Sequence, residues 1–177
     1  MIHLSHGRLV YSNMADLASY RRRSRGWEKD GPAYVHPRIV FGSGLMLTPA
    51  FTQKHGITHV INCAYDPDSP EWFKLSNPTK YKCLEAEDSI TANIFNWYSE
   101  FEHTMNLFIN DPSCKTIYIH CQCGINRSGY LTLIYACKKL KFDFKNTFKS
   151  ILQQRPCAFT NPAYRKQVED HFNVRFE

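Results

Sequence analysis

Short apolar runs, several of them rich in β-branched residues, recur along the chain between polar, turn-forming segments. Runs of this length and composition are typical of buried strands. We expect strands over residues 38–41, 58–63, 80–84 and 116–120. Gly42-Ser43-Gly44 predicts a turn after the first strand, and the two prolines within 66–70 predict a loop after the second.

Helical periodicity is strongest between residues 88 and 110. Apolar side chains recur there at alternating spacings of four and three, which is the stripe of an amphipathic helix packed on a core. The stripe consists of Ile94, Tyr98, Phe101, Met105 and Phe108. Asp111-Pro112 should end this helix, since proline does not continue one.

Four other segments predict helices. Thr48 before Pro49 is a cap followed by a proline in the first turn, so a short helix should run to residue 54 and end at Gly56. The others cover 131–139, a segment marked by Phe144, Phe148 and Ile151, and a last helix opened by Asn161-Pro162. Strands that alternate with helices indicate an α/β fold with a central, mostly parallel twisted sheet flanked by helices.

Residues 1–30 have a different composition and are expected to form a basic N-terminal arm, with the main domain over 31–177. Residues 1–35 hold six basic and three acidic side chains, which is half of the formal net charge of +6. Residues 14–20 could form a short helix capped by Asn13. The arm could dock an anionic partner or mediate dimerisation, and it could equally be a solvated, solubilising segment.

The 177 residues suit one compact domain that needs no disulfide to be stable. No stretch approaches the ~20 apolar residues of a membrane span, and residues 1–10 lack the apolar core of a signal peptide. The seven cysteines are therefore interpreted as reduced thiols of an intracellular, cytoplasmic protein, with a nuclear or virion-associated location left open.

The most informative segment is His120-Cys121-Gln122-Cys123-Gly124-Ile125-Asn126-Arg127-Ser128-Gly129, which lies between a predicted strand and a predicted helix. Anions bind at this place in parallel α/β sheets. The loop between Cys121 and Arg127 is short enough to curl into a cup whose amide groups would hold phosphate oxygens and favour the Cys121 thiolate. The guanidinium of Arg127 could bind two of these oxygens at once. The expected chemistry is attack of sulfur on phosphorus.

The same segment resembles the H-C-x5-R-S loop of cysteine-based protein tyrosine phosphatases. Its G-x-N-R-S-G form is similar to the dual-specificity branch, and most similar to the poxviral VH1-like members. VHPRIVFGS, HGITHVINCA and RPCAFTNPAYRKQVEDHF carry the likeness over roughly residues 34–175. The resemblance implies a phosphatase fold and activity on phosphotyrosine and phosphoserine or phosphothreonine in proteins, with no metal or cofactor.

The resemblance also assigns roles to individual residues. Cys121 would be the nucleophile, Arg127 the phosphate ligand, and Ser128 a donor to the Cys121 sulfur. Asp88 takes the place of the general acid, with Glu87 as the alternative; from the residues alone, Asp88 could instead cap the long helix. His120 would brace the loop, or simply be a packing residue. The main chain of the loop would bind the substrate phosphate, through Gln122, Cys123, Gly124, Ile125, Asn126 and Arg127.

Two further cysteines have alternative interpretations. Cys123, close to His120 and Cys121, could belong to a metal site, but no second pair has zinc spacing, and a small side chain at a variable loop position is favoured. Cys63 stands where some relatives place a cysteine that forms a disulfide with the nucleophile, which protects it from overoxidation. A buried, inert thiol is the alternative for Cys63.

Two other functions stay open. Related RNA 5′-triphosphatases and diphosphatases share G-x-N-R-[ST]-G-Y, which Gly129-Tyr130 would continue, but they usually carry Thr-His where this chain has Gln122-Cys123. A catalytically silent phospho-binding module is the other alternative. The presence of Cys121, Arg127 and Asp88 argues against it, because inactive relatives commonly lose one of the three.

Overall fold

The computed structural model describes residues 2–5, 8–11 and 27–176. Residues 2–11 contain an antiparallel pair of strands, β1 (Ile2–Ser5) and β2 (Arg8–Tyr11), which the sequence analysis did not anticipate. The helix expected over 14–20 lies outside the described residues.

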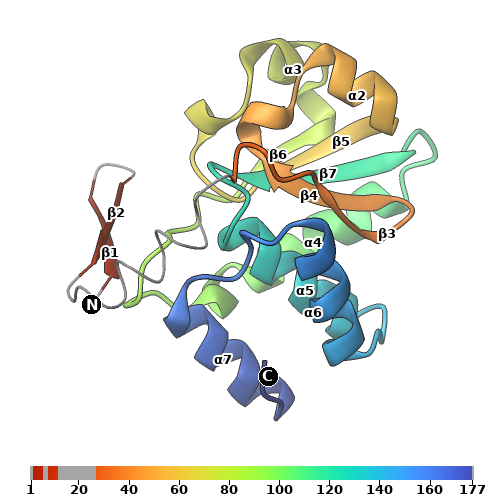
Figure 1. Cartoon of the computed structure of the whole chain (residues 1–177). Coiled ribbons are helices and arrows are strands. Elements are labelled where there is room, and N and C mark those ends of the chain that lie inside the picture. The colour runs from red at the N-terminus through yellow and green to blue at the C-terminus, as the bar shows by residue number, and fades with distance from the viewer. Residues whose placement is uncertain (1, 6–7, 12–26, 177) are drawn as a thin grey trace.

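A five-stranded sheet forms the centre of the remaining domain (Figure 1). Its strand order is β3-β4-β7-β5-β6, and only the β3–β4 pair is antiparallel. This confirms the expected α/β fold with a mostly parallel sheet. The strands are β3 (Ala33–His36), β4 (Ile39–Ser43), β5 (Ile57–Asn62), β6 (Tyr81–Cys83) and β7 (Thr116–Cys121).

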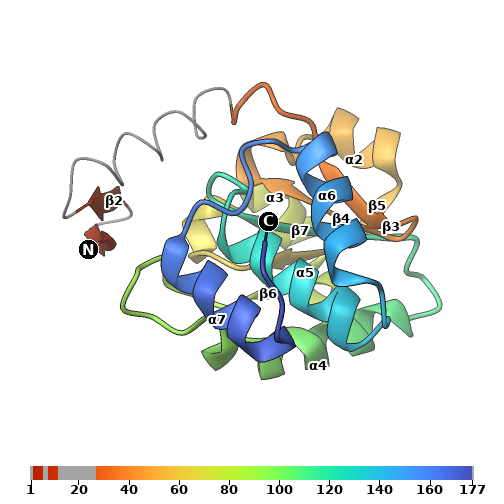
Figure 2. The same cartoon turned by 60° about the horizontal axis from the view of Figure 1, so that its bottom comes forward.

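Helices cover both faces of this sheet. They are α2 (Pro49–His55), α3 (Glu71–Ser76), α4 (Tyr98–Ile109), α5 (Arg127–Lys138), α6 (Phe144–Gln154) and α7 (Pro162–Phe172), with 3-10 turns at Gly44–Met46, Asp66–Asp68, Pro78–Lys80 and Ile94–Asn96. Helices α2 and α3 lie on one face, and α4 to α7 lie on the other (Figures 1 and 2).

Alternation along the strands builds a separate core on each face. Ile117 and Ile119 of β7 point to the larger core under α4 to α7, whereas Tyr118 between them points to the smaller core under α2 and α3. Strand β7 is the central strand of the sheet and is buried over its whole length. Because β4 and β5 run parallel to β7, the carboxyl ends of all three strands meet at one edge, where Ser43 pairs with Cys121 and Asn62 with His120.

Several expected boundaries are confirmed closely. Thr48 caps α2 by accepting a hydrogen bond from the amide of Phe51 at 3.1 Å, and Gly56 ends the helix in the left-handed conformation. Asn161 caps α7 by accepting from the amides of Ala163 and Tyr164. Local cap chemistry was sufficient to place these ends.

Two expectations were wrong. The long helix does not begin at Asp88 but at Tyr98, although the whole apolar stripe is buried as predicted. Side chains from other elements hold the backbone before it, since Arg127 donates to the carbonyl of Ala86 and Tyr164 to that of Glu87. The turn expected at 42–44 also begins later, because Gly42 and Ser43 continue β4 and pair with His120 and Cys121.

The helix expected over 131–139 begins four residues earlier, at Arg127. Its amino end is therefore part of the loop that follows β7. This brings the positive end of the α5 dipole next to Cys121, where it favours an anion.

Candidate active site

The loop from Cys121 to Arg127 joins β7 to α5 at the carboxyl edge of the sheet. The carbonyl groups of residues 121–125 each accept a hydrogen bond from a residue outside this loop. The donors are His120 Nδ1 to Cys121 at 3.0 Å, the Gly44 amide to Gln122 at 3.3 Å, Arg155 to Cys123 at 2.7 Å and to Gly124 at 2.6 Å, and the Phe159 amide to Ile125 at 3.0 Å. The surrounding residues thus hold the loop in place through its main-chain carbonyl oxygens.

The amide groups of the same loop, by contrast, are left without hydrogen-bond acceptors in the part of the chain that the structure describes. Among the described residues, the amides of 122–126 donate no hydrogen bond. Successive unpaired amides in a short loop form an anion-binding nest, and the amino end of α5 adds its dipole. This arrangement fits the predicted phosphate cradle.

Gly124 allows the loop its shape for two reasons. Its φ of 65° lies in the left-handed region that favours glycine. A Cβ at this position would lie 2.2 Å from the carbonyl carbon and 2.3 Å from the carbonyl oxygen of Gly42 in β4. Any larger residue would therefore push the loop away from the sheet.

Cys121 lies at the base of the loop with only 2% of its surface exposed. The Ser128 hydroxyl lies 3.3 Å from its sulfur, as the sequence analysis expected. A hydroxyl at this distance can donate to a thiolate and can stabilise it again as a leaving group.

Arg127 is 5% exposed and is anchored by one nitrogen, Nη1, which donates to the Ala86 carbonyl at 3.1 Å. Its Nε has no partner among the described residues. A buried guanidinium with an unpaired N–H is costly unless it binds an acceptor, and a phosphate would supply one. This orphaned donor fits an oxyanion held beside Cys121.

Asp88 lies beside this loop, 5% exposed, in a buried network of amide side chains. Its Oδ2 accepts from Asn126 Nδ2 at 3.1 Å, and its Oδ1 accepts from Asn161 Nδ2 at 2.8 Å. The structure therefore brings Asp88 to the loop, while Glu87 is exposed and contacts Tyr164 only through its carbonyl. Asp88 does not cap the long helix.

His120 is fully buried, and its ring contacts the first carbonyl of the loop. Its Nδ1 faces the Cys121 carbonyl, which only accepts, so this nitrogen carries the proton. Its Nε2 then accepts from the Ser69 hydroxyl at 2.5 Å. Burial lowers the pKa of His120 to about 4, so the ring is neutral near neutral pH.

The other predicted residues lie on or next to the loop. Gln122 is exposed and Cys123 is half-buried. Burial, reinforced by the nearby Cys121, raises the pKa of Cys123 to about 12, which disfavours its thiolate as a metal ligand. Within the described residues, no group of three His, Cys, Asp or Glu side chains is arranged to bind a metal.

Cys63 follows β5 directly, is fully buried and lies beside Cys121. Its amide donates to the His120 carbonyl at 2.7 Å, in continuation of the pairing of Asn62 with His120. Burial, and then the charge of Cys121, raises the pKa of Cys63 well above its usual value. Cys63 is therefore a protonated thiol next to Cys121.

Three supporting residues were missed by the sequence analysis: Arg155, Asn161 as a partner of Asp88, and Ser69. Arg155 and Asn161 stand in the RPCAFTNPA segment, whose likeness to relatives was noticed without a role being given to either. Their partners lie 31 or more positions away in the chain. No local pattern marks such contacts.

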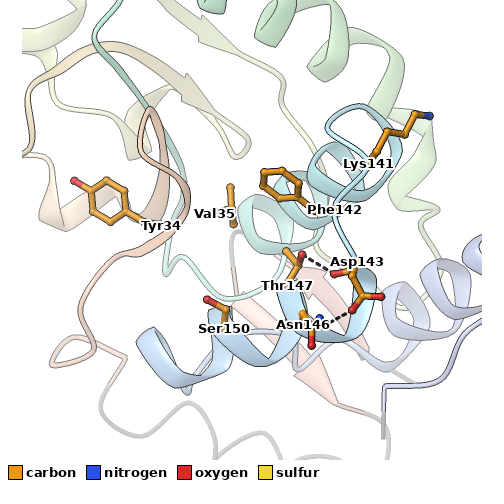
Figure 3. A pocket seen from close by; sticks show the side chains of 8 residues that line it. All are labelled: Tyr34, Val35, Lys141, Phe142, Asp143, Asn146, Thr147 and Ser150. Atoms are coloured by element: carbon orange, nitrogen blue, oxygen red, sulfur yellow. Dashed lines mark hydrogen bonds between the residues drawn. The ribbon is translucent and has the colours of Figure 1, made fainter.

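A separate pocket of about 470 Å³ lies between β3 and the start of α6 (Figure 3). Its lining includes Tyr34, Lys141, Phe142 and Ser150, and none of the predicted site residues. Lys141 follows the far end of α5 from Arg127, roughly 17 Å along a helix of 12 residues. The pocket is therefore distinct from the candidate active site.

Comparison with known families gives one match that covers most of the chain. Residues 39–174 match the family "Dual specificity phosphatase, catalytic domain". Among curated proteins, dual specificity protein phosphatase 4 of Gallus gallus is 26% identical over 142 residues, which are 80% of this chain and 36% of that protein. The chain thus spans about a third of that relative's length.

Solved structures agree on the fold. The crystal structure of DUSP15 superposes with a TM-score of 0.67 at 20% identity, covering 80% of this chain and 86% of that one. A mouse putative dual specificity phosphatase complexed with zinc tungstate gives 0.66 at 17% identity, covering 79% and 85%. These structural matches bear on the fold alone, and the poxviral likeness stays a prediction. In the described residues, no helix is both long and apolar enough to span a membrane.

Proposed function

Because the chain belongs to the dual-specificity phosphatase family, we propose that it hydrolyses phosphotyrosine and phosphoserine or phosphothreonine in proteins through a phosphocysteine on Cys121. The observation that carries the proposal is the loop itself. The carbonyls of residues 121–125 are bound by the surrounding fold, the amides of 122–126 are unpaired among the described residues, and a buried Arg127 with an unpaired N–H lies near Cys121.

The first half of the reaction transfers the phosphoryl group to sulfur. The Cys121 thiolate attacks phosphorus while the bond from phosphorus to the substrate oxygen breaks. The loop amides and Arg127 stabilise the charge on the transferring oxygens. Asp88, in its protonated form, gives its proton to the leaving phenolate or alkoxide.

The second half restores the enzyme. A water molecule attacks phosphorus of the phosphocysteine and loses its proton to Asp88. The phosphorus–sulfur bond breaks and releases inorganic phosphate, with Ser128 donating to the departing thiolate at the observed 3.3 Å contact. No metal or cofactor takes part in this scheme.

A direct comparison of substrates tests the proposal. Release of phosphate is measured from a phosphotyrosine peptide, a phosphothreonine peptide and an RNA with a 5′-triphosphate, at equal concentrations. We expect turnover of both peptides and little or none of the RNA. Preferential hydrolysis of the RNA would support the alternative substrate, and failure to hydrolyse even a generic aryl phosphate would support the silent phospho-binding module.

The resemblance of Gly129-Tyr130 to RNA phosphatases has a structural explanation in this chain. Tyr130 is fully buried and donates through its hydroxyl to the Asn161 carbonyl at 3.1 Å. Core packing and this hydrogen bond to Asn161 explain the presence of Tyr130, so the residue is no evidence for an RNA substrate. We therefore retain the protein substrate as the proposal.

Cys63 is proposed as the redox partner of Cys121. Peroxide would convert the Cys121 thiolate to a sulfenic acid, and attack by Cys63 would form the disulfide and release water. Neighbouring strands are about 4.8 Å apart, which is within the range that a disulfide spans. Mild peroxide followed by mass spectrometry should reveal the Cys63–Cys121 peptide, and a Cys63→Ser variant should instead accumulate irreversibly oxidised Cys121.

The basic arm is proposed to dock a partner or to mediate homodimer formation. Contacts with Arg155 reach back to Trp27, Asp30 and Gly31, so a truncation that tests the arm should remove only residues 1–26. A halved mass in light scattering would support the dimer. An unchanged mass would rule out this role for the removed residues.

A further inference from the structure

Arg155 is the largest fully buried side chain in the described part of the protein, and the scheme above gives it no role. It lies after α6, outside the C-x5-R segment. Its guanidinium makes hydrogen bonds on all three nitrogens. Apart from the Met46 sulfur, 4.0 Å from Nη1, the acceptors are main-chain carbonyls. This is unusual for a fully buried cation, because charges in the interior are normally paired with carboxylates.

These acceptors fall into two groups. Nε donates to the Gly124 carbonyl at 2.6 Å and Nη2 to the Cys123 carbonyl at 2.7 Å. Both carbonyls belong to the loop of residues 121–127, called the phosphate loop from here on. Nη1 donates to the carbonyls of Asp30 and Gly31, each at 2.9 Å, and Nη2 also approaches the Trp27 carbonyl at 3.4 Å. One side chain thus joins the loop to the segment before β3.

We propose that Arg155 is a positioning residue that sets the oxyanion affinity of the phosphate loop and connects it to residues 27–31. By holding the carbonyls of Cys123 and Gly124 on the outer side, Arg155 orients the peptide groups between 123 and 125, and with them the amides available to a phosphate. Its positive charge also remains next to the cradle, where it has no carboxylate partner among the described residues. The inference rests on the proposed function, because it concerns the same site.

Lysine is the informative substitution. A single ammonium group does not reproduce the planar fork that binds two carbonyls at fixed angles. In Arg155→Lys the loop carbonyls lose at least one charged donor, and loop amides displaced by even 1 Å lose much of their interaction with the oxyanion. We expect tungstate affinity, measured by calorimetry, and kcat/KM for an aryl phosphate to fall by roughly 10- to 100-fold.

Arg38 provides a matched control. It also clamps carbonyl groups, with Nε donating to Lys115 at 3.2 Å and Nη2 to Ile109 at 3.1 Å and Cys114 at 3.0 Å, but at the opposite edge of the sheet. Arg38→Lys should lower the melting temperature and leave tungstate affinity unchanged. If Arg155→Lys likewise loses only thermal stability and binds tungstate as tightly as the unmodified protein, Arg155 is merely structural and the inference is wrong.

A milder variant covers the case in which Arg155→Lys does not fold. The Asp30 carboxylate accepts from the Cys157 amide at 2.9 Å and so ties residues 27–31 to the turn that carries Arg155. Asp30→Asn weakens this tie at a partly exposed position, and tungstate affinity should fall by roughly 2- to 10-fold. Unchanged affinity in a folded Asp30→Asn protein would refute the link to residues 27–31.

Tungstate binding and aryl phosphate hydrolysis by the unmodified protein distinguish a failure of this inference from a failure of the proposed function. If it neither binds tungstate nor hydrolyses an aryl phosphate, the proposed function is wrong. If it does both, and the Arg155 variants do both equally well, only the role of Arg155 is refuted.

Discussion

The two ends of the central sheet each bury a histidine, yet they use it differently. At the amino end, His59 of β5 is hydrogen-bonded to Asp111 at 2.9 Å. At the carboxyl end, His120 of β7 is hydrogen-bonded to Ser69 and to the Cys121 carbonyl. Both rings are fully buried, so burial alone does not distinguish the two sites.

The difference lies in the balance of donors and acceptors. At the amino end, each buried N–H group of His59 and Arg38 donates to an acceptor. At the carboxyl end, the fold satisfies the carbonyls of the phosphate loop and leaves the amides of 122–126 and Arg127 Nε without partners among the described residues. A local surplus of unpaired donors therefore distinguishes the carboxyl end and fits the binding of an anion there.

The largest effect is expected from Cys121→Ser. Phosphatase activity should fall by roughly 10⁴-fold or more, because serine is a far poorer nucleophile at neutral pH and no covalent intermediate forms. Tungstate should still bind, since the donors of the loop are unchanged. Steady-state hydrolysis and calorimetry check the two expectations, and retained activity would contradict the assignment of the nucleophile.

Asp88→Asn should have the next largest effect, and its size should depend on the leaving group. Aryl phosphates with a poorly acidic phenol need protonation and should lose roughly 10²- to 10⁴-fold in kcat. Phosphates with a strongly acidic phenol should be affected much less. A uniform loss across a series of aryl phosphates would show that Asp88 supports the loop through Asn126 and Asn161 rather than acting as the acid.

His120 predicts an acid-sensitive fold at the carboxyl end. Its folded-state pKa of about 4 lies below the usual value near 6.5, so the unfolded chain binds the proton more readily and stability falls as pH drops through this range. Between pH 7 and 4.5 the free energy of unfolding should decrease by roughly 2–3 kcal/mol from this group alone. Urea titrations should show a shallower pH dependence in His120→Asn; an equal dependence would exclude His120 as its source.

Asp111 predicts a second acid-sensitive contribution, at the amino end and at lower pH, with the smallest effect on activity. Hydrogen bonds from the Ser113 amide and from His59 lower its pKa to about 2, so its contribution is present above pH 4 and is lost as pH falls toward 2. Asp111→Asn should lower the melting temperature slightly while kcat and tungstate affinity stay unchanged. A loss of tungstate affinity would show that the two ends are coupled.

The local parts of this protein could be predicted from the sequence. The strand, the C-x5-R loop and the following helix are continuous in the chain, and the caps at Thr48 and Asn161 depend on neighbouring residues only. The order of strands and helices was sufficient to predict a mostly parallel sheet. Cys121, Arg127 and Ser128 lie within eight residues, so their meeting in space followed directly from their spacing.

The tertiary structure decided what depends on distant partners. Periodicity extended the long helix back to Asp88, but contacts with Asn126, Arg127, Asn161 and Tyr164 keep residues 86–89 out of the helix and place the carboxylate at the loop. Arg155 has no motif of its own and acquires its position only when residues 27–31 and 123–124 meet around it. The sequence by itself determined the loop that carries Cys121, Arg127 and Ser128, because those contacts are local. The placement of Asp88 beside this loop and the support of the loop required the fold, because hydrogen bonds between distant segments outweigh local helical preference.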